Sequence, residues 1–198
     1  MKMKVFFIAL LMVVSARAAV GRSNPYAYEV KTVEDHARVR SFVYKSYEEC
    51  YADVQDQARN EMLPRDQEAA LLASVPKGGG IFLELLGDEW RMANGPNWTY
   101  LITDESGNEL FRSKGSYYNE PPPAYEVQKN VVYTTFGTVI NRQETQIPPQ
   151  KDDWGRPVYI MRDQKSIAVQ LPDTFKVYII DSINKNRCCY LLTRKKGS

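Results

Sequence analysis

The feature that most constrains this chain is a succession of short strand-like segments that begins after Gly80. Residues 81–86, 98–103 and 131–140 are rich in apolar, β-branched and aromatic side chains, and turn-forming residues separate them. Strands recur about every 8 to 12 residues without helical periodicity between them, a spacing typical of antiparallel sandwiches. The sequence therefore predicts a mainly β fold of the α+β kind, with an antiparallel β-sandwich over 79–196. A small open barrel is the alternative, and periodicity does not separate the two.

Three pairs of segments in this region have the pattern of β-hairpins. In the first pair, the connecting residues 104–108 read DESGN, and Gly107 supplies the positive φ that such turns favour. The predicted hairpins join 98–103 to 109–112, 158–161 to 167–171, and 175–180 to 188–193.

Residues before Gly80 follow a helical period instead. Thr32 can cap a helix, and from there to about residue 62 the apolar residues fall on one face at 100° per residue. Pro64 interrupts this pattern, and 65–74 reads as a second, shorter helix. We therefore predict a linker over 19–31 and an N-terminal amphipathic helical segment over 32–75. Its apolar face would pack on the sheet, bind a protein partner or self-associate with another copy.

The amino terminus has the three parts of a secretory signal peptide. Lys2 and Lys4 precede an apolar run over 5–14, and Ala16-Arg17-Ala18 supplies the small residues that a signal peptidase requires. We predict a signal peptide over 1–18, cleaved near Ala18, and export to the periplasm or the extracellular space. The run is shorter than the roughly 20 residues of a membrane span, so no membrane span is expected.

Charge argues against a nucleic-acid partner. Cleavage would remove three of the 26 basic residues and leave 23 against 24 acidic ones. A near-neutral protein lacks the basic surface that binds nucleic acid. We therefore expect no nucleic-acid binding.

Three cysteines, Cys50, Cys188 and Cys189, are disulfide candidates in an exported protein. Adjacent residues of a strand point to opposite faces, so at most one of the last two can readily reach Cys50. The alternative is that all three are buried apolar thiols. Three scattered thiols and a single histidine lack metal-ligand spacing, so neither a metal nor a cofactor is expected.

Catalysis finds little support in the sequence. His36 is the sole histidine, and its position in the first turn of the predicted helix is typical of a packing residue. The adjacent carboxylates 48/49, 88/89 and 152/153 diverge on any helix or strand, so none forms a ready acid–base pair. We therefore predict that the protein is not an enzyme.

Tryptophans supply the binding candidates. Trp90, Trp98 and Trp154 lie in the β region, and Trp154 stands beside Asp153 and Arg156 in a turn-like stretch. A loop tryptophan with such neighbours can stack on a sugar ring or anchor a protein interface. It can also simply close the end of a sandwich.

Residues 119–126, NEPPPAYE, contain a Pro-Pro-x-Tyr motif that WW-type modules can read. Such readers work mainly in the cytosol, so the predicted signal peptide favours a structural role as a rigid bridge between strands. Taken together, the sequence predicts an exported, non-catalytic interaction or envelope-associated module. The alternative is a small glycan- or ligand-binding module that uses Trp90, Trp98, Trp154 and Arg156.

Overall fold

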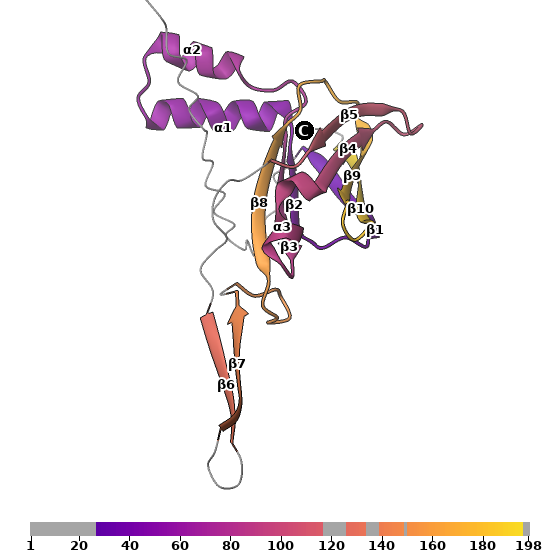
Figure 1. Ribbon diagram of the computed structural model, residues 1–198. Coiled ribbons are helices and arrows are strands. Elements are labelled where there is room, and N and C mark those ends of the chain that lie inside the picture. The colour runs from indigo at the N-terminus through magenta and orange to yellow at the C-terminus, as the bar shows by residue number, and fades with distance from the viewer. Residues whose placement is uncertain (1–26, 117–125, 134–138, 149, 196–198) are drawn as a thin grey trace, which may run out of the picture.

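The computed structural model describes residues 27–116, 126–133, 139–148 and 150–195 (Figure 1). The predicted signal peptide and the proline run lie outside these residues. In chain order the elements are β1 (Tyr28–Asp35), β2 (Val39–Lys45), α1 (Tyr47–Asn60), α2 (Arg65–Ala73), β3 (Gly80–Gly87), α3 (Trp90–Ala93), the 3₁₀ turn η1 (Gly95–Asn97), β4 (Trp98–Thr103), β5 (Glu109–Lys114), β6 (Glu126–Tyr133), β7 (Val139–Ile147), β8 (Tyr159–Ser166), β9 (Thr174–Asp181) and β10 (Asn186–Arg194).

The protein is mainly β, with two antiparallel main sheets. One sheet has five strands in the order β1-β10-β9-β4-β5, and the other has three in the order β2-β3-β8. Strands β6 and β7 pair with each other as a separate two-stranded ribbon. The described strands do not form a closed barrel, because each sheet ends in edge strands.

Alternating side chains from both main sheets fill one hydrophobic core. Burial alternates along β3 and along β9, which places Ile81, Leu83 and Leu85 in the core on one side and Phe175, Val177 and Ile179 on the other. The same cluster takes in Trp98, Tyr100 and Ile102 of β4, and Cys188, Tyr190 and Leu192 of β10. Side chains from both sheets therefore contribute to one cluster of buried residues.

Aromatic rings join the two sheets at the edge formed by β1 and β2. Tyr28 of β1, Tyr44 of β2 and Phe175 of β9 meet edge to face, with centroids 5.2 to 5.5 Å apart. Phe42 of β2 stacks on Tyr190 of β10 with centroids 4.1 Å apart. Aromatic pairs in these geometries add about 0.5 to 1.5 kcal/mol each beyond the area they bury.

The helical segment begins later than the sequence predicted. Thr32 lies in β1, and α1 starts after Ser46, whose hydroxyl accepts a hydrogen bond from the Glu49 backbone N–H at 3.3 Å. The Glu49 carboxylate in turn accepts from the Ser46 backbone N–H at 2.7 Å, which completes a capping box. The prediction of helix over 32–45 is wrong, because this stretch gains its hydrogen bonds by pairing with β10 and β3, far away in the sequence.

The domain boundaries in the structure also differ from the predicted ones. β1 begins at Tyr28, inside the predicted linker, and both β1 and β2 belong to the main sheets, which are not confined to 79–196. The predicted hairpin of 158–161 with 167–171 is also wrong, since β8 runs unbroken from Tyr159 to Ser166. The sequence predicts one strand over 131–140, whereas the structure places 131–133 at the end of β6 and 139–140 at the start of β7. The other two predicted hairpins are confirmed as β4–β5 and β9–β10.

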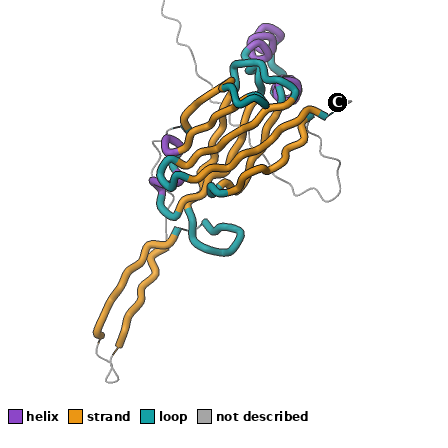
Figure 2. The backbone as a smooth tube through the Cα atoms, turned by 90° about the vertical axis from the view of Figure 1, so that its right-hand side faces the viewer, coloured by secondary structure: helices purple, strands orange, loops and turns teal. Residues whose placement is uncertain are grey.

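Two elements extend away from the packed sheets at opposite ends of the protein. Helices α1 and α2 lie side by side at one end, and the β6–β7 ribbon projects from the other (Figures 1 and 2). The buried side of α1 is covered within the chain, where Cys50 and Val54 pack against Val75, Leu71 and Leu72. None of the described helices has the length and apolar character that a membrane-spanning helix needs.

Candidate functional site

The loop between β7 and β8 carries the most exposed tryptophan of the predicted set. Trp154 is 85 % exposed. The loop is held by the carboxylate of Asp152, which accepts hydrogen bonds from the backbone N–H groups of Trp154 at 3.0 Å and Arg156 at 2.9 Å. Arg156 also donates from Nε to Asp152 at 2.7 Å. Gly155 has φ +76°, which this tight turn requires.

The acidity of Asp152 follows from these contacts. Burial acts to raise the pKa of its carboxyl, but the hydrogen bonds from Arg156 and from the Trp154 backbone outweigh burial and hold that pKa below its ordinary value. Asp152 is therefore ionised at neutral pH and fixes the loop that presents Trp154.

A hollow of about 300 Å³ lies beside this loop. The loop contributes Asp152, Asp153, Trp154 and Arg156 to the lining of this hollow. The other lining residues come from β1, β2, β3 and the segment between β1 and β2: Asp35, Ala37, Arg38, Val39, Arg40 and Leu86. Arg40 donates to Asp153 at 3.2 Å, which ties the loop to β2. The structure thus brings together Trp154 and Arg156, two of the predicted binding residues.

The other two predicted tryptophans lie elsewhere. Trp98 is fully buried in the core, and its indole N–H donates to the Met92 carbonyl at 3.1 Å, so the prediction that it binds a ligand is wrong. Trp90 is half-buried and packs edge to face on Tyr159 with centroids 6.2 Å apart. It is absent from the residues that line the hollow beside Trp154.

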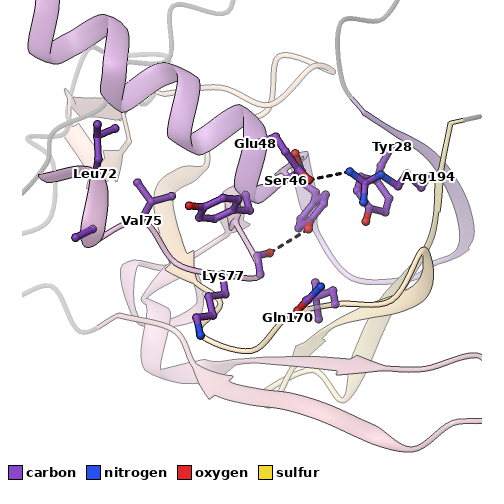
Figure 3. Close-up of a pocket in the computed structure, with 13 residues that line it drawn as sticks. Tyr28, Ser46, Glu48, Leu72, Val75, Lys77, Gln170 and Arg194 are labelled. Carbon is purple, nitrogen blue, oxygen red and sulfur yellow. Dashed lines mark hydrogen bonds and ion pairs between the residues drawn. The ribbon is translucent and has the colours of Figure 1, made fainter. Parts of the chain in front are cut away.

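A second hollow, of about 400 Å³, lies where α1 and α2 meet the sheets (Figure 3). Leu72 and Val75 lie on one side of it, and Lys77 and Gln170 lie along another. On the side facing them, Arg194 donates to Glu48 at 2.8 Å. None of the residues that the sequence singled out for binding lines this hollow. Its walls come from segments distant in the sequence, so periodicity gave no signal for it.

Titratable groups in this second hollow are tied to structural tasks. Tyr44 donates from its hydroxyl to the Gly78 carbonyl at 3.0 Å, and burial raises its pKa far above the ordinary range. Burial likewise raises the pKa of Tyr28. A backbone hydrogen bond, with Arg194 as a further cause, holds the pKa of Glu48 below its ordinary value. These groups remain in one protonation state near neutral pH.

All three cysteines are buried free thiols. Cys50 packs in the small cluster under α1, whereas Cys188 belongs to the main core and donates to the Ala37 carbonyl at 3.2 Å. Cys50 and Cys188 therefore lie in different clusters, and none of the three cysteines is bonded to another. Burial raises the pKa of Cys50 and of Cys188 to about 11, which keeps both thiols protonated.

Buried carboxylates in the described part of the chain also have structural partners. Asp163 accepts from the Tyr100 hydroxyl at 2.6 Å and from the Ser116 backbone N–H at 2.9 Å. Asp181 accepts from the backbone N–H groups of Ile183 and Asn184 in the turn between β9 and β10. His36, the predicted helix-start residue, is exposed between β1 and β2, and its backbone N–H donates to the Arg187 carbonyl at 3.1 Å.

The β6–β7 ribbon is a feature that sequence reasoning missed. Successive side chains of a strand point to opposite faces, yet Gln143, Glu144, Thr145 and Gln146 are all exposed. Val127 on β6 is 49 % exposed, and Lys129 pairs with Glu144 across the ribbon at 3.2 Å. Over these residues, both faces of the ribbon are open to solvent.

Comparison of the chain with protein-family models, with curated proteins and with solved structures found no match.

Proposed function

We propose that this is an exported, non-catalytic protein that works by contact, and that it joins a second copy of itself through the β6–β7 ribbon. Export follows from the signal-like residues 1–18. The observation that carries the rest is the ribbon itself, which pairs with neither main sheet and extends away from them (Figure 1).

An isolated two-stranded ribbon is marginally stable at best in water, because it has no third strand or covering face. Among the described strands, none pairs with the outer edge of β6 or of β7. Unpaired edges present rows of backbone N–H and C=O groups that another strand can satisfy. A strand from a partner would therefore add the hydrogen bonds that the ribbon lacks.

The sequence of β7 favours another β7 as that partner. When two β7 strands pair antiparallel around Gln143, the apolar residues at the strand ends face each other and the two charged residues face their opposites. The opposed residues are Val139 with Ile147, Ile140 with Gln146, Asn141 with Thr145, and Arg142 with Glu144. This two-fold arrangement pairs apolar with apolar at the ends and opposite charges near the centre.

The same charges disfavour other strands. In most other registers, and with most other partner strands, Arg142 or Glu144 or both would stand opposite a residue that does not carry the opposite charge. Natural proteins use edge charges in this way to prevent non-specific pairing. The β6 edge is less suited to its own copy, because pairing centred on Lys129 would oppose two ammonium groups.

A non-catalytic role is supported by how the reactive groups are used. The thiols of Cys50 and Cys188 are buried with raised pKa values. The carboxylates of Asp152 and Asp163 are buried, and each accepts hydrogen bonds from other groups of the protein.

For the packed sheets we infer an antiparallel β-sandwich. Support comes from the single core that the inward faces of the five-stranded and three-stranded sheets share. The helical segment then serves to cover one end of it. Self-association through the helices has less support, since Cys50 and Val54 are already covered by Val75 and α2.

The proposal is tested by the mass of the chain 19–198 in solution, measured by light scattering over a wide range of concentrations. We expect a monomer–dimer equilibrium. A variant in which 126–147 is replaced by a short Gly-Ser linker should stay monomeric and unfold at the same urea concentration, because the described core contains no residue of the ribbon. An unchanged dimer in that variant, or a monomeric parent chain at every concentration, would overturn the proposal.

A further inference from the structure

We propose that the hollow beside Trp154 binds a neutral saccharide, with the indole ring stacked on one sugar and the arginine and aspartate groups around it bound to the hydroxyls. This site lies in the loop between β7 and β8 and the adjoining ends of β2 and β3, and it does not depend on the self-association of the ribbon.

The position of the tryptophan is the first observation. Trp154 presents a large aromatic ring that is 85 % exposed, and tryptophan is among the residue types that most often anchor binding interfaces. The loop under it is rigid, because Asp152 holds the backbone N–H groups of Trp154 and Arg156 and the Arg156 side chain. The backbone that carries the ring is therefore held in place, which reduces the conformational freedom that the loop loses on binding.

The charges around the hollow are the second observation. Its lining residues include three arginines, Arg38, Arg40 and Arg156, and three aspartates, Asp35, Asp152 and Asp153. A site for a phosphate, sulfate or other anion would carry an excess of positive charge, and this one is balanced. A balanced set of planar donors and acceptors suits a neutral ligand with many hydroxyls.

These polar groups are also fixed in direction. Arg40 is tied to Asp153 at 3.2 Å, Arg38 is paired with Asp88, and Arg156 is paired with Asp152. A guanidinium has five N–H donors, and one ion pair does not use them all. The remaining N–H groups of each guanidinium can donate to ligand hydroxyls, and the ion pairs fix their orientation before the ligand binds, as is usual in small-molecule sites.

The size and floor of the hollow are the third observation. Its volume of about 300 Å³ lies at the small end of the range for small-molecule sites, which suits one or two sugar rings. Ala37, Val39 and Leu86 contribute apolar surface beside the polar groups. Sugar rings have apolar C–H faces and polar edges, so a site with both kinds of surface matches them.

The test is a binding titration of the chain 19–198 with neutral oligosaccharides of glucose, of galactose and of N-acetylglucosamine, followed by calorimetry and by tryptophan fluorescence. A glycan array that includes sulfated and sialylated glycans is measured in parallel. We expect saturable binding of at least one neutral series and no preference for the anionic glycans. Trp154→Ala should weaken that binding at least about tenfold. Trp154→Phe, which keeps a flat ring, should stay within about threefold of the parent.

Trp90→Phe is the matched control, because Trp90 lies outside the hollow and packs on Tyr159. It should bind as the parent does, and so should the chain with the ribbon replaced. Circular dichroism of each variant shows whether the fold is kept. The proposal is overturned if no neutral series binds at millimolar concentration, if Trp154→Ala binds as well as the parent, or if anionic glycans bind best. A parent chain that binds saccharide but stays monomeric at every concentration would count against the proposed function alone.

Discussion

Tyr100→Phe removes one hydrogen bond from a buried carboxylate and keeps the aromatic ring in place. The Tyr100 hydroxyl donates to Asp163 at 2.6 Å. Tyr100 is fully buried, and Asp163 is only 3 % exposed. Asp163 would keep the donors Ser116 and Gln164, whose backbone N–H groups lie 2.9 and 2.8 Å from its oxygens. The carboxylate would thus remain buried with one bond fewer.

A hydrogen bond to a charged group contributes about 1.5 to 3 kcal/mol, so we expect the free energy of unfolding to fall by that amount. For a chain of this size, each kcal/mol lowers Tm by about 2 to 4 °C, which gives a decrease of about 3 to 12 °C. Urea unfolding followed by tryptophan fluorescence measures it, since Trp98 is in the same core. The midpoint should fall while the m-value stays constant.

Tyr159→Phe is the control for this experiment. It keeps the ring that packs on Trp90 and should change the free energy of unfolding by less than about 0.5 kcal/mol. Equal stability of Tyr100→Phe and the parent would refute the reasoning, because it would mean that Asp163 does not depend on this donor.

Three further predictions follow from single contacts. Gly79→Ala should lower the free energy of unfolding by at least about 1 kcal/mol, because Gly79 has φ +75° and an added Cβ would lie 2.0 Å from a backbone oxygen. Urea unfolding measures this, and an unchanged midpoint would contradict it. The lowered pKa of Asp152 means that its contribution to loop stability is complete above its ordinary value of 3.8 and is lost as pH falls through the lower folded value. The protection factor of the Trp154 backbone amide, which is its exchange relative to the intrinsic rate at each pH, should therefore fall only in that acidic range, and a fall between pH 7 and pH 5 would refute the assignment. At pH 8 a thiol reagent should label Cys50 and Cys188 only slowly in the native protein, since burial raises the pKa of both thiols to about 11. After unfolding it should label all three cysteines. A single reactive thiol in the unfolded, unreduced protein would instead demonstrate a disulfide.

Elements set by local pattern could be predicted from the sequence. The short apolar run over 81–86 identifies β3, and the turn residues between flanking β-rich segments identify the β4–β5 and β9–β10 hairpins. These features depend on near neighbours in the chain. The helix start was also readable, since Ser46 and Glu49 have the spacing of a capping box, but the apolar residues before it suggested a longer helix.

Elements set by distant partners could not be predicted. β1 is almost wholly exposed apart from Tyr28, so its sequence carries little β pattern, and its pairing with β10 decides its structure. The same holds for the site. Trp154 and Arg156 could be chosen from their turn-like surroundings, but Arg38 and Arg40 reach the hollow through the pairing of β2 with β3. Trp98 differs from Trp154 in burial, which depends on the packing of whole sheets.

The charge pair across two β7 strands gives the most direct test of the proposed association. Arg142→Glu would oppose two acidic residues in the two-fold pairing and leave the pair of Lys129 with Glu144 within each ribbon intact. Combining Arg142→Glu with Glu144→Arg and Lys129→Glu reverses the charge at all three positions and restores both kinds of pair. By sedimentation equilibrium, we expect the parent chain to dimerise, the single variant to be monomeric and the triple variant to dimerise again. Dimerisation of the single variant as strong as that of the parent, or a triple variant that stays monomeric, would contradict the account.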